Sequence, residues 1–139
     1  MRGATPNDAA VWASLRTLLW PESPLSEHAA EIEQYFRGEL EEPQEVLLCE
    51  TAGGEIVGIV ELSVRRQVPG CATELVGFVE GMFVIPAWRH AGVARSLLRS
   101  SHDWARGQGC AEFASDRAER VIIDRRFSQP IGPDFIGDS

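Results

Sequence analysis

The chain has 139 residues and a formal net charge of −8, from 21 acidic against 13 basic residues. Hydrophobic residues make up 44% of it, which suffices for one domain with a modest core. The acidic balance argues against nucleic acid or an anionic membrane as a partner and favours a polycationic small molecule, although acidity also serves solubility. Neither a transmembrane span nor a leader is recognised, so a cytoplasmic protein is expected, and a bacterial cytoplasm fits.

Two helices are predicted in the first 38 residues. Thr5 is a favourable N-cap with Pro6 at the first helical position, and an apolar face then continues to Trp20. The second helix follows Pro24 and ends before Gly38. We expect the side chains of His28 and His102 to face solvent.

Four strands and a third helix are predicted further along: strands over 46–49, 55–64, 75–84 and 110–115, and a helix over about 91–106. Gly53-Gly54 makes the first two strands an antiparallel hairpin. Residues 65–73, which include Pro69-Gly70, are predicted to form a loop. A hairpin followed by strand, crossover helix and strand predicts a mixed α/β sheet with helices packed against it.

The junction between the strand at 75–84 and the third helix has the features of a phosphate-binding turn. Backbone N–H groups at a helix start lack partners and carry the positive end of the helix dipole. Gly92 allows close approach of the backbone, and Arg89 adds a guanidinium suited to phosphate oxygens. Glycine and arginine also begin ordinary surface helices. The predicted phosphate contacts are Arg89, His90, Ala91, Gly92, Val93, Ala94 and Arg95.

Arg89-x-x-Gly92-x-Ala94, after a strand and before a helix, resembles the pyrophosphate signature Gln/Arg-x-x-Gly-x-Gly/Ala of the GNAT superfamily of N-acetyltransferases. Three further stretches are similar to the aminoglycoside 6′-N-acetyltransferases within it: Leu19-Trp20-Pro21, residues 78–84 and residues 109–116. The resemblance implies the acyl-CoA N-acyltransferase fold, with acetyl-CoA as co-substrate. It also implies that the strands at 75–84 and 110–115 splay apart around the pantetheine arm, and that an aminoglycoside 6′-amine attacks the thioester directly, which confers antibiotic resistance.

The resemblance also implies roles for individual residues. Glu80 is expected in substrate binding and base catalysis, and Asp116 contacts the substrate amine and is the rival base. Trp20 is expected to pack against an aminoglycoside ring. Each residue also has a purely structural interpretation. The Glu80 carboxylate could be paired with an arginine or a backbone donor, Asp116 could cap a loop or helix, and Trp20 could be a core residue. Main-chain groups of Met82, Phe83 and Val84 would pair with the pantetheine, and no cluster has metal-ligand spacing.

The family pattern breaks off after Asp116. Where the family has a loop, a helix along the pantetheine and further strands, Arg117-Ala118 here leads directly into residues 119–127, through an internal deletion or a shifted reading frame. We expect one domain over 1–127, with its C-terminal helix and strands incomplete, and an irregular tail over 128–139. A sheet edge left exposed near 110–115 favours a homodimer with exchanged C-terminal strands. Alternatives are an impaired relative that binds CoA or a cationic ligand, and an acetyltransferase for another polyamine or a peptide amine.

Overall fold

The computed structural model describes residues 1–117, 120–124 and 127. Within these residues one mixed sheet has its strands in sequence order, β1 to β6. Neighbouring strands are antiparallel, except that β4 and β5 are parallel. The predicted mixed α/β fold is confirmed. The strands are β1 (Arg2–Gly3), β2 (Glu45–Glu50), β3 (Ile56–Arg66), β4 (Leu75–Val84), β5 (Glu112–Arg117) and β6 (Arg120–Ile123).

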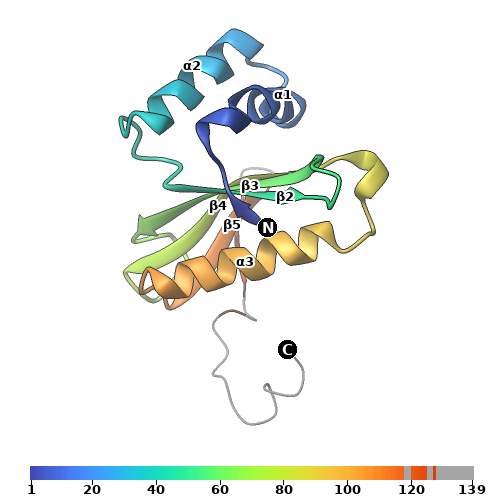
Figure 1. Cartoon of the computed structure of the whole chain (residues 1–139). Helices are drawn as coiled ribbons and strands as arrows, with labels where there is room; N and C mark the ends of the chain where they lie inside the picture. The colour runs from blue at the N-terminus through green and yellow to red at the C-terminus, as the bar shows by residue number, and fades with distance from the viewer. Residues whose placement is uncertain (118–119, 125–126, 128–139) are drawn as a thin grey trace.

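The helices form a layer on each side of the sheet, with α1 (Ala9–Leu19) and α2 (Leu25–Phe36) over one face and α3 (Val93–Gly107) over the other (Figure 1). Single 3₁₀ turns, η1 (Pro6–Asp8) and η2 (Pro86–Trp88), precede α1 and α3. Because alternate strand residues face opposite sides, each face of the sheet carries a large cluster of core residues, and a smaller third cluster includes Val76 and Phe78. Trp12, Ile32, Val46 and Ile59 pack beneath α1 and α2, and Val60, Leu62, Leu97 and Phe113 pack beneath α3.

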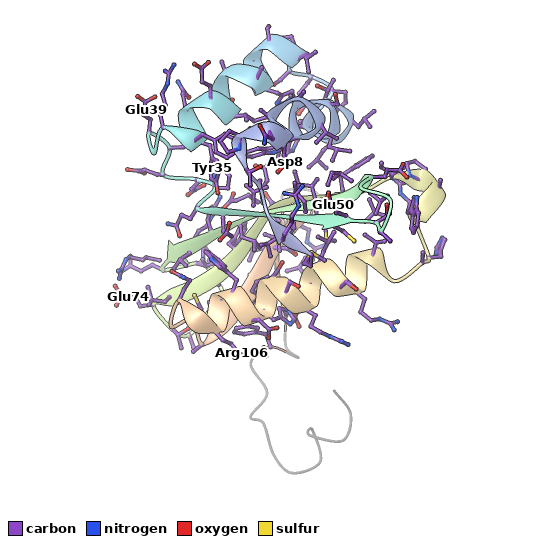
Figure 2. The ribbon with its side chains drawn as sticks, in the orientation of Figure 1. Asp8, Tyr35, Glu39, Glu50, Glu74 and Arg106 are labelled. Carbon is purple, nitrogen blue, oxygen red and sulfur yellow. The ribbon has the colours of Figure 1, made fainter. Side chains whose placement is uncertain are left out.

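The core cluster beneath α1 and α2 is closed by aromatic side chains of α2. Tyr35 points into the space between α2 and the sheet (Figure 2), where its ring lies edge-on to Trp12 at 5.1 Å between centroids. Burial raises the pKa of Tyr35 to about 12. None of the helices in the described ranges is long and apolar enough to cross a bilayer.

Strands β4 and β5 pair over a short stretch and then diverge. The parallel pairing runs from Val76 with Glu112 to Val79 with Ser115. Beyond it, residues 80–84 of β4 continue alongside β3, whereas β5 continues alongside β6. The expected splay of these two strands is therefore present.

A β-bulge lies in β4 at the point of divergence. Glu61 of β3 pairs with Gly81, but the next residue of β3, Leu62, pairs with Val79, so Glu80 is the extra residue. A bulge redirects side chains at the edge of regular pairing, often beside a site. Here the position of a Cβ on Gly81 faces Trp20 at the end of α1, and Glu80 lies beside it in the sequence.

Three expectations about the sheet and its surroundings were wrong. Arg65 and Arg66 belong to β3, where they pair with Val76 and Leu75, rather than to a loop. The outer edge of β5 is covered by β6, so the open edge near 110–115 does not exist. His28 is buried and His102 is half-buried, because each packs under its helix against other rings instead of facing solvent.

The region after Asp116 is short. Only residues 118–119 separate β5 from β6, which leaves no space for a helix between these strands. This agrees with the incomplete C-terminal part inferred from the sequence. The tail expected over 128–139 lies outside the described residues.

Candidate active site

A groove of about 660 Å³ runs along the end of β4 and the turn before α3. Gly92, the residue before α3, has φ +84, and no atom lies within 4 Å of the position a Cβ would take. The backbone there is thus open to a ligand. The lining consists of Met82, Phe83, Val84, Trp88, Arg89, His90, Gly92, Ala94 and Arg95.

The groove offers two sets of backbone groups for hydrogen bonding: the N–H groups at the start of α3 and the open edge of β4. The first helical bond of α3 runs from the Ser96 N–H to the Gly92 carbonyl at 3.0 Å, so the N–H groups of the three residues between have no acceptor within the helix. Arg89 Nε donates to the Val84 carbonyl at 3.0 Å, which fixes the turn to β4. The edge of β4 facing away from β3 is open beyond Val79. These groups fit a pyrophosphate followed by an extended arm that carries amides.

Two of the predicted phosphate contacts do not line this groove. The side chain of Val93 is buried against β3, where its Cγ1 would lie 2.8 Å from a Cβ on Gly58. Val93 therefore has only its N–H to offer. Ala91 is exposed and is absent from the lining.

A second cavity, of about 940 Å³, lies where β4 and β5 diverge. Glu80, Asp116 and Trp20, the three predicted substrate residues, all line it. Met82 lines both this cavity and the groove, so the two meet at β4. Among the lining residues that sequence reasoning missed are Ile122, Ile123 and Asp124, which follow the stretches that carry the resemblance.

The carboxylate of Glu80 is mostly buried, with 15% of its side chain exposed. Arg65 donates to it twice, from Nε to Oε2 at 2.8 Å and from Nη2 to Oε1 at 2.6 Å. The carboxylate raises the pKa of Arg65. Glu80 therefore has the arginine partner that was considered as an alternative to a functional role, and its side chain also lines the cavity.

Trp20 is held from several sides. Its backbone N–H donates to the Arg16 carbonyl at 2.7 Å, and the Arg16 guanidinium lies 5.1 Å from its ring centroid. His28 Nε2 lies 3.1 Å from the Trp20 carbonyl oxygen. A Cβ on Gly81 would lie 2.6 Å from the indole ring, so only glycine leaves room for this tryptophan. The Arg16 guanidinium thus makes a cation–π contact with the indole ring.

Glu61 is a buried carboxylate that the sequence analysis did not single out. It is 2% exposed on β3, accepts a hydrogen bond from Trp12 Nε1 at 2.9 Å, and lies 3.3 Å from Arg16 Nε. Burial raises the pKa of Glu61. A glutamate inside the apolar run of β3 was the available signal. Through Arg16 it supports Trp20.

No group of three or more His, Cys, Asp or Glu side chains is arranged to hold a metal ion in the part of the chain that the structure describes. The two cavities present carboxylates, an indole, backbone amides and a helix start.

Comparison with known proteins identifies the fold and its relatives. The model of the acetyltransferase (GNAT) family matches residues 12–122, and the chain belongs to this family. The chain is similar to the aminoglycoside N(6′)-acetyltransferase type 1 of Klebsiella aerogenes, with 40% identity over 116 residues, which span 84% of this chain and 76% of the relative. The resemblance noted in the sequence is thereby confirmed.

Solved structures give the same result. The aminoglycoside antibiotic 6′-N-acetyltransferase of Acinetobacter haemolyticus matches with a TM-score of 0.75 and 35% identity, over 84% of this chain and 78% of that one. A related enzyme, AAC(6′)-Iy, was solved with the bisubstrate analogue CoA-S-monomethyl-acetylneamine. It matches with a TM-score of 0.74 and 32% identity, over 84% and 78% of the two chains.

Proposed function

We propose that the protein transfers an acetyl group from acetyl-CoA to the 6′-amine of aminoglycosides and so confers resistance to them. The observation that carries the proposal is the meeting of two sites at Met82: a groove suited to a phosphate-bearing cofactor, and a cavity that presents Glu80 and Asp116. The names of the relatives and the bisubstrate complex of AAC(6′)-Iy support the same reaction.

The cofactor side of the site would hold the CoA moiety through its backbone. Residues 93–95 offer N–H groups at the start of α3 for the pyrophosphate, with Arg89, His90, Gly92 and Arg95 around them. Main-chain groups of Met82, Phe83 and Val84 would pair with the pantetheine amides. When bound, acetyl-CoA supplies the thioester that the amine attacks directly.

On the substrate side, the carboxylates of Glu80 and Asp116 would bind and deprotonate the amine. An aminoglycoside amine is mostly protonated at neutral pH, so it must lose a proton before it can attack. Glu80 and Asp116 would bind the ammonium group between them, and one of the two would receive the proton. Trp20 would pack against the sugar ring that carries the amine.

We further infer that residues 1–127 form the acetyltransferase domain, that it acts in the cytoplasm, and that two copies associate through their C-terminal strands. β6 is one of the two edge strands of the described sheet, and Val121 and Ile122 are 39% and 43% exposed on it. An exposed apolar edge strand is a template for pairing with another chain. A native mass measurement that gives only the monomer contradicts the dimer.

The reaction is tested by measuring thiol release from acetyl-CoA with tobramycin and, separately, with spermidine. The proposal predicts release with tobramycin and a product that carries one added acetyl group. Release with spermidine alone would assign the site to simple polyamines, and no release with either amine would contradict the enzyme assignment.

A further inference from the structure

The ion pair between Arg65 and Glu80 fixes the orientation of the Glu80 carboxylate as well as balancing its charge. Arg65 holds one carboxylate oxygen with Nε at 2.8 Å and the other with Nη2 at 2.6 Å. Two parallel bonds from a planar guanidinium define the plane of the carboxylate. We propose that Arg65 is a positioning residue for acetyl transfer, which sets how Glu80 faces the substrate amine. This inference rests on the proposed function, in which Glu80 receives that amine.

The position of Glu80 in the strand explains why such a restraint is needed. As the extra residue of the bulge, Glu80 has no residue directly opposite it on β3. Side chains in regular pairs are held by cross-strand neighbours, and Glu80 lacks this support. Arg65, four residues further along β3 than Glu61, supplies it through the guanidinium.

Arg65 is itself fixed by three contacts, two with β4 and one with the segment between α2 and β2. Its backbone pairs with Val76 in β4. Its guanidinium lies 4.2 Å from the ring centroid of Phe78, a side chain that is 3% exposed and therefore part of the core. Nη2 also lies 3.1 Å from Glu42 Oε2, in the segment between α2 and β2. An arginine held in this way has little freedom left to lose when it binds a carboxylate.

Arg65 acts from outside the cavity. Glu80 belongs to the lining of the cavity at the divergence of β4 and β5, whereas Arg65 does not, and 39% of the Arg65 side chain is exposed. The guanidinium therefore contacts Glu80 without occupying the volume available to substrate. This arrangement distinguishes a positioning group from one that touches the reacting atoms.

The neighbouring residue provides a matched control. Arg66 also forms an ion pair, with Glu74 at 2.6 Å, but both side chains are more than 60% exposed, at 67% and 63%. Figure 2 shows Glu74 at the outer end of the sheet, pointing away from the body of the protein. Replacing Arg66 thus removes the same charge and a similar bond without touching Glu80.

The test compares the steady-state kinetics of Arg65→Gln, Arg65→Lys and Arg66→Gln with tobramycin and acetyl-CoA, after thermal unfolding has shown that each variant is folded. Arg65→Gln is expected to lower kcat by about 100-fold, since small misplacement of a reacting group costs that much. Arg65→Lys keeps the charge but cannot make two parallel bonds, so it restores part of kcat, to within about tenfold of wild type. Arg66→Gln leaves kcat unchanged, and KM for acetyl-CoA is the same in all three.

Each other result overturns the inference. Equal kcat in Arg65→Gln and Arg66→Gln would show that the pairing with Glu80 does not matter for turnover. If Arg65→Gln does not fold, the test rests on Arg65→Lys. A wild-type kcat in Arg65→Lys would show that a positive charge beside Glu80 is enough for turnover and that the two parallel bonds are not needed. A wild-type protein without tobramycin-dependent turnover would overturn the proposed function and, with it, this inference.

Discussion

Two adjacent residues in the bulge of β4 have different tasks. Glu80 carries the carboxylate of the cavity, and Gly81 leaves space for the Trp20 ring. The one-residue shift in pairing with β3 accounts for both. Neither the bulge nor the ion pair between Arg65 and Glu80 could be predicted. Residues 75–84 have the pattern of one regular apolar strand, and Arg65 was predicted to begin a loop.

Gly81→Ala tests the space beneath Trp20. The added methyl group would lie 2.6 Å from the indole, so the ring must move, with a cost of about 1–3 kcal/mol in stability. We expect KM for tobramycin to rise about tenfold, in line with a lost aromatic contact of this size. KM for acetyl-CoA stays unchanged. Gly53→Ala, in an exposed turn with its nearest atom at 3.8 Å, is the control and should alter neither constant. Unchanged kinetics in Gly81→Ala would exclude Trp20 from substrate binding.

Glu80→Gln tests the carboxylate itself. The amide keeps the shape of the side chain but cannot accept a proton, so kcat should fall by about 10²–10⁴-fold. Acetyl-CoA binding, measured by calorimetry, should be retained. Asp116→Asn shows which carboxylate is the base, because the residue that only binds the ammonium affects KM more than kcat. Glu74→Gln, on the exposed pair with Arg66, is the matched control. A loss of acetyl-CoA binding as large as the loss of kcat in Glu80→Gln would contradict the role assigned to Glu80.

At the scale of elements, periodicity and turn residues served well. The predicted strand at 75–84 has the same bounds as β4, and the helix predicted at 91–106 lies within two residues of α3 at each end. The failures involve long-range contacts. His28 packs against Trp20, and His102 packs against Phe113 of β5 and contacts Asp124 after β6. The local sequence around the two histidines does not predict these partners.

Gly92→Ala tests the start of α3 as a phosphate site. Gly92 has φ +84, and Gly109, just beyond the C-terminal end of α3, has φ +87. An alanine at either position costs about 1–2 kcal/mol in backbone strain. The two variants should therefore lose similar thermal stability. Only Gly92→Ala should raise KM for acetyl-CoA, by about tenfold or more, because its Cβ projects where the phosphates approach. A similar rise in Gly109→Ala would assign the effect to strain instead of phosphate binding.

The contact between α3 and the segment after β6 should make stability depend on pH. His102 Nε2 lies 2.8 Å from Asp124 Oδ2, with Arg106 and Asp103 nearby on α3. Burial lowers the pKa of His102 below its ordinary 6.5, against the opposing effect of Asp124. The folded chain then binds fewer protons than the unfolded chain, so stability falls as pH drops below about 6.5 and is constant above it.

Urea unfolding at about pH 7.5 and about pH 5 measures this effect against His102→Gln, which has no imidazole to protonate. The wild type should lose more unfolding free energy between the two pH values than the variant does. The same loss in both would show that the His102 imidazole does not cause the dependence.

For the whole molecule, the arrangement is a sheet with helices on both faces and two cavities at one point of divergence. The net charge of −8 suits a polycationic substrate, and the groove at α3 supplies the local positive potential that an anionic cofactor needs. We therefore expect a regiospecific reaction, in which one amine of the aminoglycoside reaches Glu80 and Asp116 and its other amines remain outside the cavity.

The most direct test is the mass of the products formed from acetyl-CoA with neomycin and with paromomycin, which differ only in carrying an amine or a hydroxyl at the 6′ position. We expect one added acetyl group on neomycin, located at 6′ by fragmentation, and none on paromomycin. Equal acetylation of both compounds would show that another amine is the acceptor and would contradict the 6′ assignment.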